Sequence, residues 1–290
     1  MKQIIKYSIP VLLLLSIVAA CEKEYESIQS IDSKNIKAYI QTNKLNAVEY
    51  QDSGIYYEVI TPGSGVDLEY SDQVPLIFTI KSIDGKYVAS DTLSASNRYY
   101  NFLGYFSPEG VRVGIKEVLK KKSGVIRMII PSTSAFGRNG AGDIPGNTSL
   151  DLTVKVLDKN KIAAYDDATI QKYMSTNSLS GFTKTSSGLY YKIDVSGTGS
   201  PITADSTKKA EYEGKLLNGT IFDKSNAGTP VTLALTDVVK GWQQAVPLIK
   251  EGGTIRMILP SALAYGLEGN NGIPAFSCLY FSVKVTEVLQ

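Results

Sequence analysis

Residues 211–223 read Glu-Tyr-Glu-Gly-Lys-Leu-Leu-Asn-Gly-Thr-Ile-Phe-Asp, and residues 238–242 read Val-Val-Lys-Gly-Trp. The pair Asn218-Gly219 between apolar stretches is a strong signal for a β-hairpin. Trp242 is the only tryptophan of the chain, and it follows a glycine that permits close backbone approach before a helix. These stretches therefore predict a hairpin followed by one short helix within residues 238–249.

Strand patterns surround this pair of stretches. Apolar and alternating runs predict strands at 191–195, 210–212, 254–259 and 279–288. A helical pattern in Ile170, Tyr173 and Met174 precedes them, behind Asp166-Asp167. The expected fold class is therefore α+β, with an antiparallel β-sheet wrapped over a short α-helix and an extra helix at the N-terminus.

The chain repeats this unit. Residues 53–57 (Ser-Gly-Ile-Tyr-Tyr) match residues 187–191 (Ser-Gly-Leu-Tyr-Tyr), and residues 126–132 match residues 255–261 almost letter for letter. The offset falls from 134 to 129 residues between the two matches, so the first copy carries about five extra residues in its middle. A unit of this length is a duplicated domain rather than a solenoid repeat.

The expected boundaries follow from the repeat. Residues 34–160 form the first domain and residues 161–290 the second, with 158–168 as the joint between them. The first domain opens with its own helical pattern, for which Asp32 or Ser33 is the expected N-cap.

Composition limits the classes of function. The 290 residues carry a formal net charge of +2, which gives no indication of a nucleic-acid partner. Histidine is absent, so histidine-based catalysis and histidine metal ligands are excluded. The two cysteines, Cys21 and Cys278, have no neighbour at metal-ligand or redox spacing, and no metal site is expected.

The N-terminus is typical of a targeting segment. Lys2 and Lys6 precede a short apolar run that ends Val-Ala-Ala-Cys at Cys21. This resembles a bacterial lipobox, with residues 1–20 as signal peptide, Cys21 as the lipidated residue and 21–33 as a tether. The alternative is an ordinary secretory signal with a chance cysteine. The lipobox predicts a protein anchored in the bacterial cell envelope by its lipid, at the outer membrane on its periplasmic or surface face.

The motifs of the second copy, in this order and spacing, resemble the FKBP family of peptidyl-prolyl cis–trans isomerases. The resemblance covers about 80 residues, from Tyr212 through the stretch 255–260 and Tyr265 to Phe281. It implies two tandem FKBP-like domains. It also implies a pocket that binds proline-containing polypeptides and needs no cofactor.

The resemblance assigns roles to residues of the second copy. It implies catalytic roles for Tyr212, Asp223 and Tyr265. Trp242 would be the pocket floor, and the Val239 N–H would hold a substrate carbonyl. The implied substrate-binding residues are Phe222, Val231, Leu233, Val238, Val239, Trp242, Ile273 and Phe281.

Some positions depart from the family pattern. Val231 and Leu233 stand where the family usually has aromatic side chains, and Asn270 stands where histidine is frequent. The expected pocket is therefore shallower and less aromatic on one side, so any macrolide binding should be weak.

The first copy keeps the sheet pattern but loses the pocket chemistry. By the repeat offsets, 134 residues before the insertion and 129 after it, Ala89 replaces Asp223, Val113 replaces Trp242 and Phe136 replaces Tyr265. The aromatic cluster Tyr99, Tyr100, Phe102, Tyr105 and Phe106 either forms a partner-binding patch or fills the space over a vacant pocket, and the second interpretation is preferred.

Two hypotheses for function remain. The first is a lipid-anchored isomerase that acts on X-Pro bonds of exported proteins through its second domain, with an inactive first domain. The alternative is a non-catalytic FKBP-like binding or chaperone module. A glycan-related lipoprotein is a third, with support only from the anchor and the aromatic residues.

Overall fold

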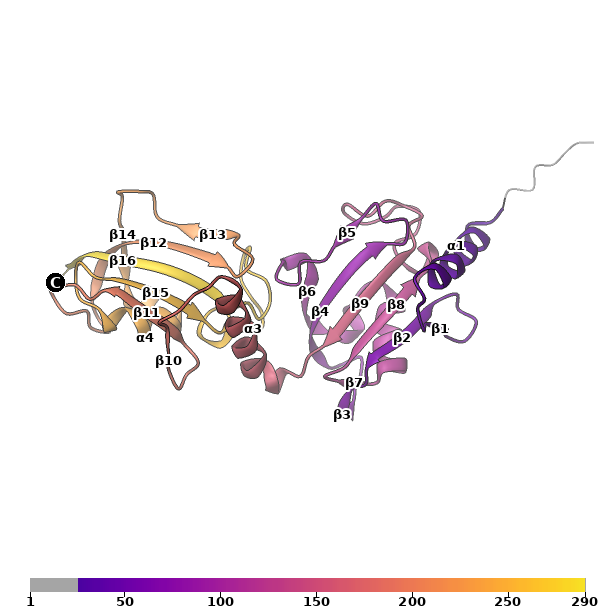
Figure 1. Cartoon of the computed structure of the whole chain (residues 1–290), viewed down its shortest axis with the longest axis horizontal. Helices are drawn as coiled ribbons and strands as arrows, with labels where there is room; N and C mark the ends of the chain where they lie inside the picture. Colours follow the sequence, from indigo (N-terminus) through magenta and orange to yellow (C-terminus); the bar gives the residue numbers. More distant parts are fainter. Residues whose placement is uncertain (1–25, 290) are drawn as a thin grey trace, which may run out of the picture.

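The computed structural model describes residues 26–289, so the predicted signal peptide and Cys21 lie outside the described residues. Within the described residues, no helix is long and apolar enough to cross a membrane. The chain forms two lobes that lie side by side along the long axis of the molecule (Figure 1). Each lobe combines an antiparallel sheet with a few helices, which confirms the predicted α+β class.

The N-terminal lobe holds a seven-stranded sheet in the order β1-β2-β8-β9-β4-β5, with β6 also beside β4. Its strands are β1 (Val48–Glu49), β2 (Tyr56–Thr61), β4 (Gln73–Ser82), β5 (Val88–Ala89), β6 (Arg98–Phe102), β8 (Val125–Ile130) and β9 (Leu150–Val156), and β3 (Ser64–Asp67) pairs separately with β7 (Lys121–Lys122). Its helices are α1 (Ile28–Thr42), α2 (Glu109–Val113), which continues as a π-helix over Gly114–Leu119, and the short 3₁₀ turns Ala95–Asn97, Leu103–Tyr105 and Ser132–Ser134.

The C-terminal lobe repeats this order as β10-β11-β15-β16-β12-β13, with β14 beside β12. Its strands are β10 (Thr183–Lys184), β11 (Tyr190–Val195), β12 (Thr207–Leu216), β13 (Ile221–Lys224), β14 (Val231–Ala234), β15 (Thr254–Leu259) and β16 (Leu279–Leu289). Its helices are α3 (Ile162–Thr176), α4 (Lys240–Ala245) and the 3₁₀ turns Lys159–Lys161, Leu235–Asp237, Val246–Leu248 and Ser261–Leu263. The identical strand order agrees with the duplication that the sequence predicts.

The predicted hairpin is present. β12 pairs antiparallel with β13 across Asn218-Gly219, and Gly219 has a φ of +92°, a left-handed conformation that glycine adopts without a steric cost. α4 begins two residues before Trp242, within the range predicted for one short helix. Its buried residues Trp242 and Ala245, together with Val246 directly after the helix, belong to the same apolar core as the inward side chains of β15 and β16.

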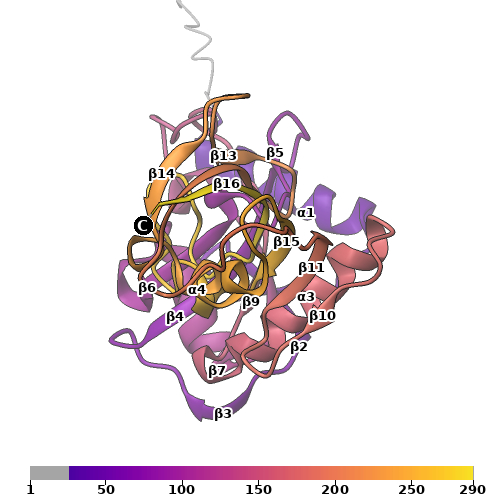
Figure 2. The same cartoon turned by 90° about the vertical axis from the view of Figure 1, so that its left-hand side faces the viewer.

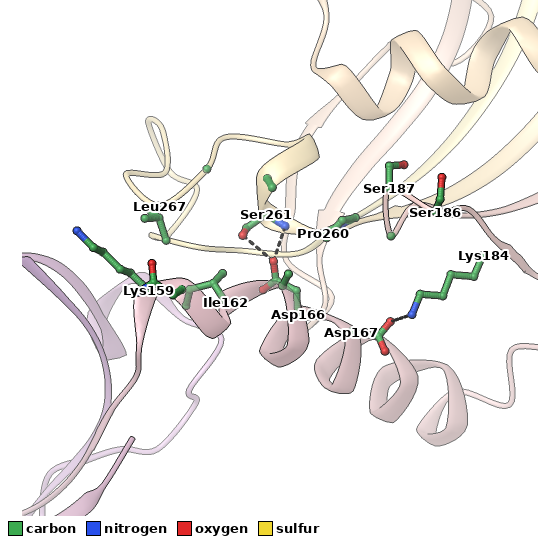
Figure 3. A pocket seen from close by; sticks show the side chains of 15 residues that line it. Lys159, Ile162, Asp166, Asp167, Lys184, Ser186, Ser187, Pro260, Ser261 and Leu267 are labelled. Carbon is green, nitrogen blue, oxygen red and sulfur yellow. Dashed lines mark hydrogen bonds and ion pairs between the residues drawn. The ribbon is translucent and has the colours of Figure 1, made fainter. Parts of the chain in front are cut away.

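The helices α1 and α3 dock in the same way, each by one buried aspartate. Asp32 Oδ2 accepts hydrogen bonds from the Ser132 N–H (2.8 Å) and hydroxyl (2.7 Å), and Asp32 Oδ1 accepts one from the Ser149 hydroxyl (2.8 Å). Asp166 Oδ2 makes the equivalent pair with Ser261, at 2.8 Å and 2.6 Å (Figure 3). Seen end-on in Figure 2, α1 and α3 lie on the same side of the molecule.

The structure corrects one expectation. Asp32 or Ser33 is the predicted N-cap, but the helix begins earlier and its N-cap is Ser27, which accepts from the Ser30 N–H. Asp32 lies inside α1, where its carboxylate accepts hydrogen bonds from Ser132, 100 residues away in the sequence. α3 starts at Ile162, so most of the predicted joint 158–168 is helical, and the joint itself stays a prediction.

The two aspartates differ in one partner. Cys278 stands at the position of Ser149 in the repeat, so Oδ1 of Asp166 has no hydrogen-bond partner among the described residues. Burial raises the pKa of Asp166, although the two bonds from Ser261 act in the opposite direction.

Candidate functional site

Trp242 is the centre of the aromatic cluster in the C-terminal lobe. Its side chain is 3% exposed, and the rings of Tyr212 and Phe281 each meet it edge-on at a centroid distance of 5.4 Å. Edge-on pairs at this distance are a favourable arrangement of aromatic rings. Gly241 lets α4 approach the sheet closely, because a Cβ at this position would overlap the Leu259 side chain. The predicted pocket floor is therefore fixed by β12, β16 and α4 together.

A second glycine makes room for the neighbouring rings. Phe222 on β13 meets Phe281 edge-on at 5.6 Å. A Cβ at Gly214 would lie 2.6 Å from the Phe281 ring and 2.8 Å from the Phe222 ring, so only glycine fits between them. Gly214 is a residue of the site that the role assignment missed, although it stands in the Tyr-Glu-Gly stretch that carries the sequence signal.

Tyr212 and Asp223 form the polar edge of the cluster. The Tyr212 hydroxyl donates to Asp223 Oδ2 at 2.7 Å, and the Tyr212 backbone N–H donates to the Ser225 hydroxyl at 3.0 Å. Burial, followed by the bond to Asp223, raises the pKa of Tyr212 to about 12. The Tyr212 hydroxyl therefore stays protonated at physiological pH and orients the carboxylate.

Two hydrogen-bond donors at this cluster have no partner among residues 26–289. The Tyr265 hydroxyl donates to no group there, and its ring packs half-buried against the core. The Val239 N–H precedes α4 and is likewise unpaired, whereas the Val239 carbonyl accepts from the Trp242 N–H. Both groups are therefore free to donate to a ligand, and the roles predicted for them stay predictions.

The remaining predicted residues are not equally placed. Ile273 is buried in the same core, and Leu233, Val238 and Val239 pack against it half-buried. Val231 is 38% exposed and lies outside this packed cluster, although it shares β14 with Leu233. The structure thus brings together every predicted side chain except Val231.

A comparison with known proteins finds a family match within the C-terminal lobe. A family model described as "FKBP-type peptidyl-prolyl cis-trans isomerase" matches residues 199–286. Through these residues, the C-terminal lobe is similar to the FKBP-type peptidyl-prolyl cis–trans isomerase family. All of the catalytic and substrate-binding residues predicted from the sequence lie within the FKBP-matched range.

Several FKBP-type relatives are called FkpA. The chain is 43% identical over 113 residues to FkpA of Buchnera aphidicola subsp. Acyrthosiphon pisum, which covers 39% of this chain and 47% of the relative. It is 44% identical over 110 residues to a probable FkpA of Neisseria meningitidis serogroup B, covering 37% and 40%. The crystal structure of FkpA from Escherichia coli is 34% identical, with 45% of this chain and 62% of that chain covered and a TM-score of 0.40. The chain spans less than half the length of the two curated relatives.

The offset of 129 residues, which makes Val113 the counterpart of Trp242, does not hold between α2 and α4. Gly110 packs against Ile130 as Gly241 packs against Leu259, so the counterpart of Trp242 is the fully buried Val111 and not Val113. The reason is that the five extra residues are spread over several loops. Pairing on β4 and β12 places Tyr99 opposite Leu76 as Val231 is opposite Ala210, so the offset has already changed before α2.

The N-terminal lobe fills its own pocket with an aromatic side chain. Phe106 is buried and meets Phe78, the counterpart of Tyr212, edge-on at 5.3 Å. Tyr99 meets Phe106 edge-on at 4.8 Å. Phe106 and Tyr99 thus pack as the preferred interpretation expects. Phe102 and Tyr105 are exposed, and Tyr100 packs in a separate cluster with Phe276.

A cavity of about 490 Å³ lies between α3 and the segments 184–188 and 260–267 (Figure 3). Its lining combines apolar side chains such as Ile162 and Leu267 with Lys159 and the ion pair of Asp167 with Lys184 (2.6 Å). None of the predicted site residues lines it, so it is separate from the FKBP-type aromatic cluster. Among the described residues, no group of three or more Cys, Asp or Glu side chains is arranged to hold a metal ion.

Proposed function

We propose that the chain is a peptidyl-prolyl cis–trans isomerase whose active site is the aromatic cluster around Trp242. The observation that carries the proposal is the combination of Tyr212, Trp242 and Phe281 in edge-on contact with a Tyr212–Asp223 hydrogen bond, within the residues that match the family.

The chemistry of the reaction suits such a site. Rotation about a peptide bond has a barrier of about 18–20 kcal/mol because the amide is resonance-stabilised. The two isomers of an X-Pro bond differ by only about 0.5–1 kcal/mol, so the limitation is kinetic. A catalyst needs no nucleophile and no metal. It must bind the twisted amide, which has lost conjugation, more tightly than the planar one.

Each part of the cluster has a proposed task in this scheme. The apolar rings of Trp242 and Phe281 would take the proline ring and exclude water from the amide. The Val239 N–H would hold one substrate carbonyl in place, and the Tyr265 hydroxyl would donate to a second carbonyl at the rim. Donors fixed before the substrate arrives cost little reorganisation when the amide twists. Asp223, held by Tyr212, would give the edge of the pocket its negative polarity.

The domain organisation and the location are part of the proposal. We take residues 34–160 as a degenerate FKBP-like domain and residues 161–290 as the catalytic one, with 1–20 as signal peptide, 21–33 as tether and lipidation at Cys21. The substrates would be proline-containing segments of exported proteins at the cell envelope. Loss of fatty-acid labelling in Cys21→Ala would support the anchor, and undiminished labelling would contradict it.

The test of the activity is the isomerisation rate of short X-Pro peptides with the full chain. Asp223→Ala and Tyr265→Phe should each lower kcat/KM by about tenfold, because each removes one hydrogen bond of about 1 kcal/mol or more near the twisted amide. Trp242→Ala should abolish turnover and also cost about 3–5 kcal/mol of stability.

Tyr190→Phe is a matched control. Its hydroxyl donates to Asp167 Oδ1 at 2.7 Å, the same length as the Tyr212–Asp223 bond. This pair joins β11 to α3, and Tyr190 packs in a different core cluster from Trp242. Turnover should be unchanged in this control. Unchanged turnover in Asp223→Ala and Tyr265→Phe would contradict their assigned roles. Peptide binding without any turnover in the wild-type protein would favour the non-catalytic binding module.

A further inference from the structure

One arginine of the N-terminal lobe reaches into the C-terminal lobe. Arg98, at the start of β6, is only 7% exposed. Its Nη1 donates to the carbonyl oxygens of Phe276 (2.7 Å) and Ala275 (3.3 Å), and its Nε donates to the Thr92 carbonyl in its own lobe at 2.8 Å. The guanidinium also lies over the Phe276 ring, 4.9 Å from its centroid. The Arg98 side chain thus contacts both the backbone and the Phe276 ring of one loop in the C-terminal lobe.

The loop that Arg98 contacts has an unusual residue at its turn. Phe276 is fully buried and has a φ of +41°, in the left-handed region that large side chains rarely adopt. The counterpart in the first lobe is Asn147, with a φ of +56°. The loops are otherwise alike, because the Phe276 N–H donates to Gly266 O (3.1 Å) and the Asn147 N–H to Gly137 O (2.7 Å).

Asparagine tolerates the left-handed region, whereas phenylalanine persists there only where its surroundings hold it. The surroundings of Phe276 include the other lobe. Its ring packs in one cluster with Ile77 and Leu157 of the N-terminal lobe and with Ile162 at the start of α3. The second copy has therefore exchanged a self-sufficient turn for one that depends on contacts across the lobes.

This loop also carries part of the proposed pocket. Ile273 lies three residues before Phe276 and is buried beside the aromatic cluster. Gly266, which accepts the Phe276 N–H, directly follows Tyr265, whose hydroxyl is a proposed donor to substrate. The turn at Phe276 therefore positions both ends of this segment: Tyr265, the proposed donor, and Ile273, a residue of the proposed pocket wall.

We propose that Arg98 is a positioning residue for the isomerase pocket, and that the N-terminal lobe serves the C-terminal lobe by fixing the loop 265–276. This rests on the proposed function of that pocket. Arg98 does not touch substrate and acts through Phe276 on Tyr265 and Ile273. The strand equivalent to β6 in the C-terminal lobe is β14, which lies beside the proposed pocket. In the N-terminal lobe the equivalent strand carries Arg98 and contacts the other lobe.

The experiment compares Arg98→Ala and Arg98→Lys with Asp91→Ala in the full chain. Asp91 is the matched control, since its carboxylate accepts a hydrogen bond from Asn218 across the same interface (2.6 Å) without contacting the loop. Three quantities are measured: kcat/KM on a short X-Pro peptide, acrylamide quenching of fluorescence, and hydrogen exchange of residues 265–276. The fluorescence reports on the pocket because Trp242 is the only tryptophan.

Arg98→Ala should lower kcat/KM by roughly fivefold or more, the range of a typical coupling between sites. It should also increase the quenching of Trp242 and speed exchange in the loop. Arg98→Lys should restore part of each, because lysine keeps the charge but not the planar fork. Asp91→Ala should resemble the wild type.

Unchanged quenching and loop exchange in Arg98→Ala would overturn the proposal, and so would equal effects of Asp91→Ala. If Arg98→Ala does not fold, the Arg98→Lys values decide. If the wild-type protein has no isomerase activity, the proposed function fails alone, since quenching and exchange still report whether Arg98 holds the loop.

Discussion

Lys208 is the residue that fits least well into the core. It is fully buried on the same face of β12 as Ala210, and its Nζ has no hydrogen-bond partner among the described residues. Its counterpart in the first copy is the buried Val74. Burial lowers the pKa of Lys208 from 10.5 to about 8, because the charged form is poorly solvated there.

Lys208→Met should therefore stabilise the protein. At pH 7 the free energy of unfolding should rise by up to about 3 kcal/mol, which is the free-energy equivalent of this pKa shift. Between pH 8 and 10.5 the unfolded chain holds the proton that the folded chain has lost, so wild-type stability rises with pH across this window. The advantage of the variant should shrink accordingly, as measured by urea unfolding at pH 7 and pH 10.

Lys209→Met is the control for this substitution. Lys209 lies next in the strand but is partly exposed and forms an ion pair with Glu287 at 2.7 Å. An exposed pair contributes little, so this variant should change stability by no more than about 0.5 kcal/mol at either pH. A Lys208→Met variant no more stable than wild type at pH 7, or with the same advantage at pH 10, would contradict the argument.

At the scale of elements, α2 and α4 differ in what fills the space above them. Trp242 occupies this space in the C-terminal lobe, whereas Val111 leaves it to Phe106 in the N-terminal lobe. Val111→Trp should therefore destabilise the N-terminal lobe by about 1–3 kcal/mol through overpacking, and should not create isomerase activity. Urea unfolding measures the loss.

Val113→Trp is the matched substitution, since Val113 is only half-buried and the added ring has access to solvent. It should cost clearly less than Val111→Trp. Equal costs would indicate that the two helices do not correspond in the register given by Gly110 and Gly241.

Much at this scale could be predicted from the sequence, because it depends on local pattern. The Asn218-Gly219 turn and the alternating strands are local signals, and both are confirmed. The N-cap of α1 could not be predicted from them, since Asp32 serves Ser132 at a distance of 100 residues in the sequence. The prediction of Val113 as the counterpart of Trp242 is wrong, because a single offset cannot show at which loops the extra residues are inserted.

In the proposed pocket, too, residues that belong to a local sequence pattern could be predicted, and those that depend on distant contacts could not. Its aromatic residues carry a spacing that matches a family, so Tyr212, Asp223 and Trp242 could be named in advance and lie together in the structure. Arg98 could not, because its contact with Phe276 joins residues 178 apart in the sequence and belongs to no repeated motif.

At the scale of the whole molecule, the lobes share apolar packing. Domains of one chain usually move relative to each other unless their interface is large and hydrophobic. Here Ile77 and Leu157 of one lobe pack with Phe276 of the other. Leu93 of the N-terminal lobe also packs against a buried cluster that includes Leu217. We therefore expect the full chain to unfold in a single calorimetric transition.

Phe276→Asn should separate this transition into two. Asparagine suits the left-handed turn, as Asn147 does in the first copy, and should relieve backbone strain of about 1 kcal/mol or more within the C-terminal lobe. The substitution also removes the ring that Arg98 covers, so the lobes lose their shared cluster while each keeps its own core. Tyr105→Asn removes an aromatic ring that is 73% exposed and should leave the single transition intact. Coincident unfolding of both lobes in Phe276→Asn would show that their coupling does not pass through this residue.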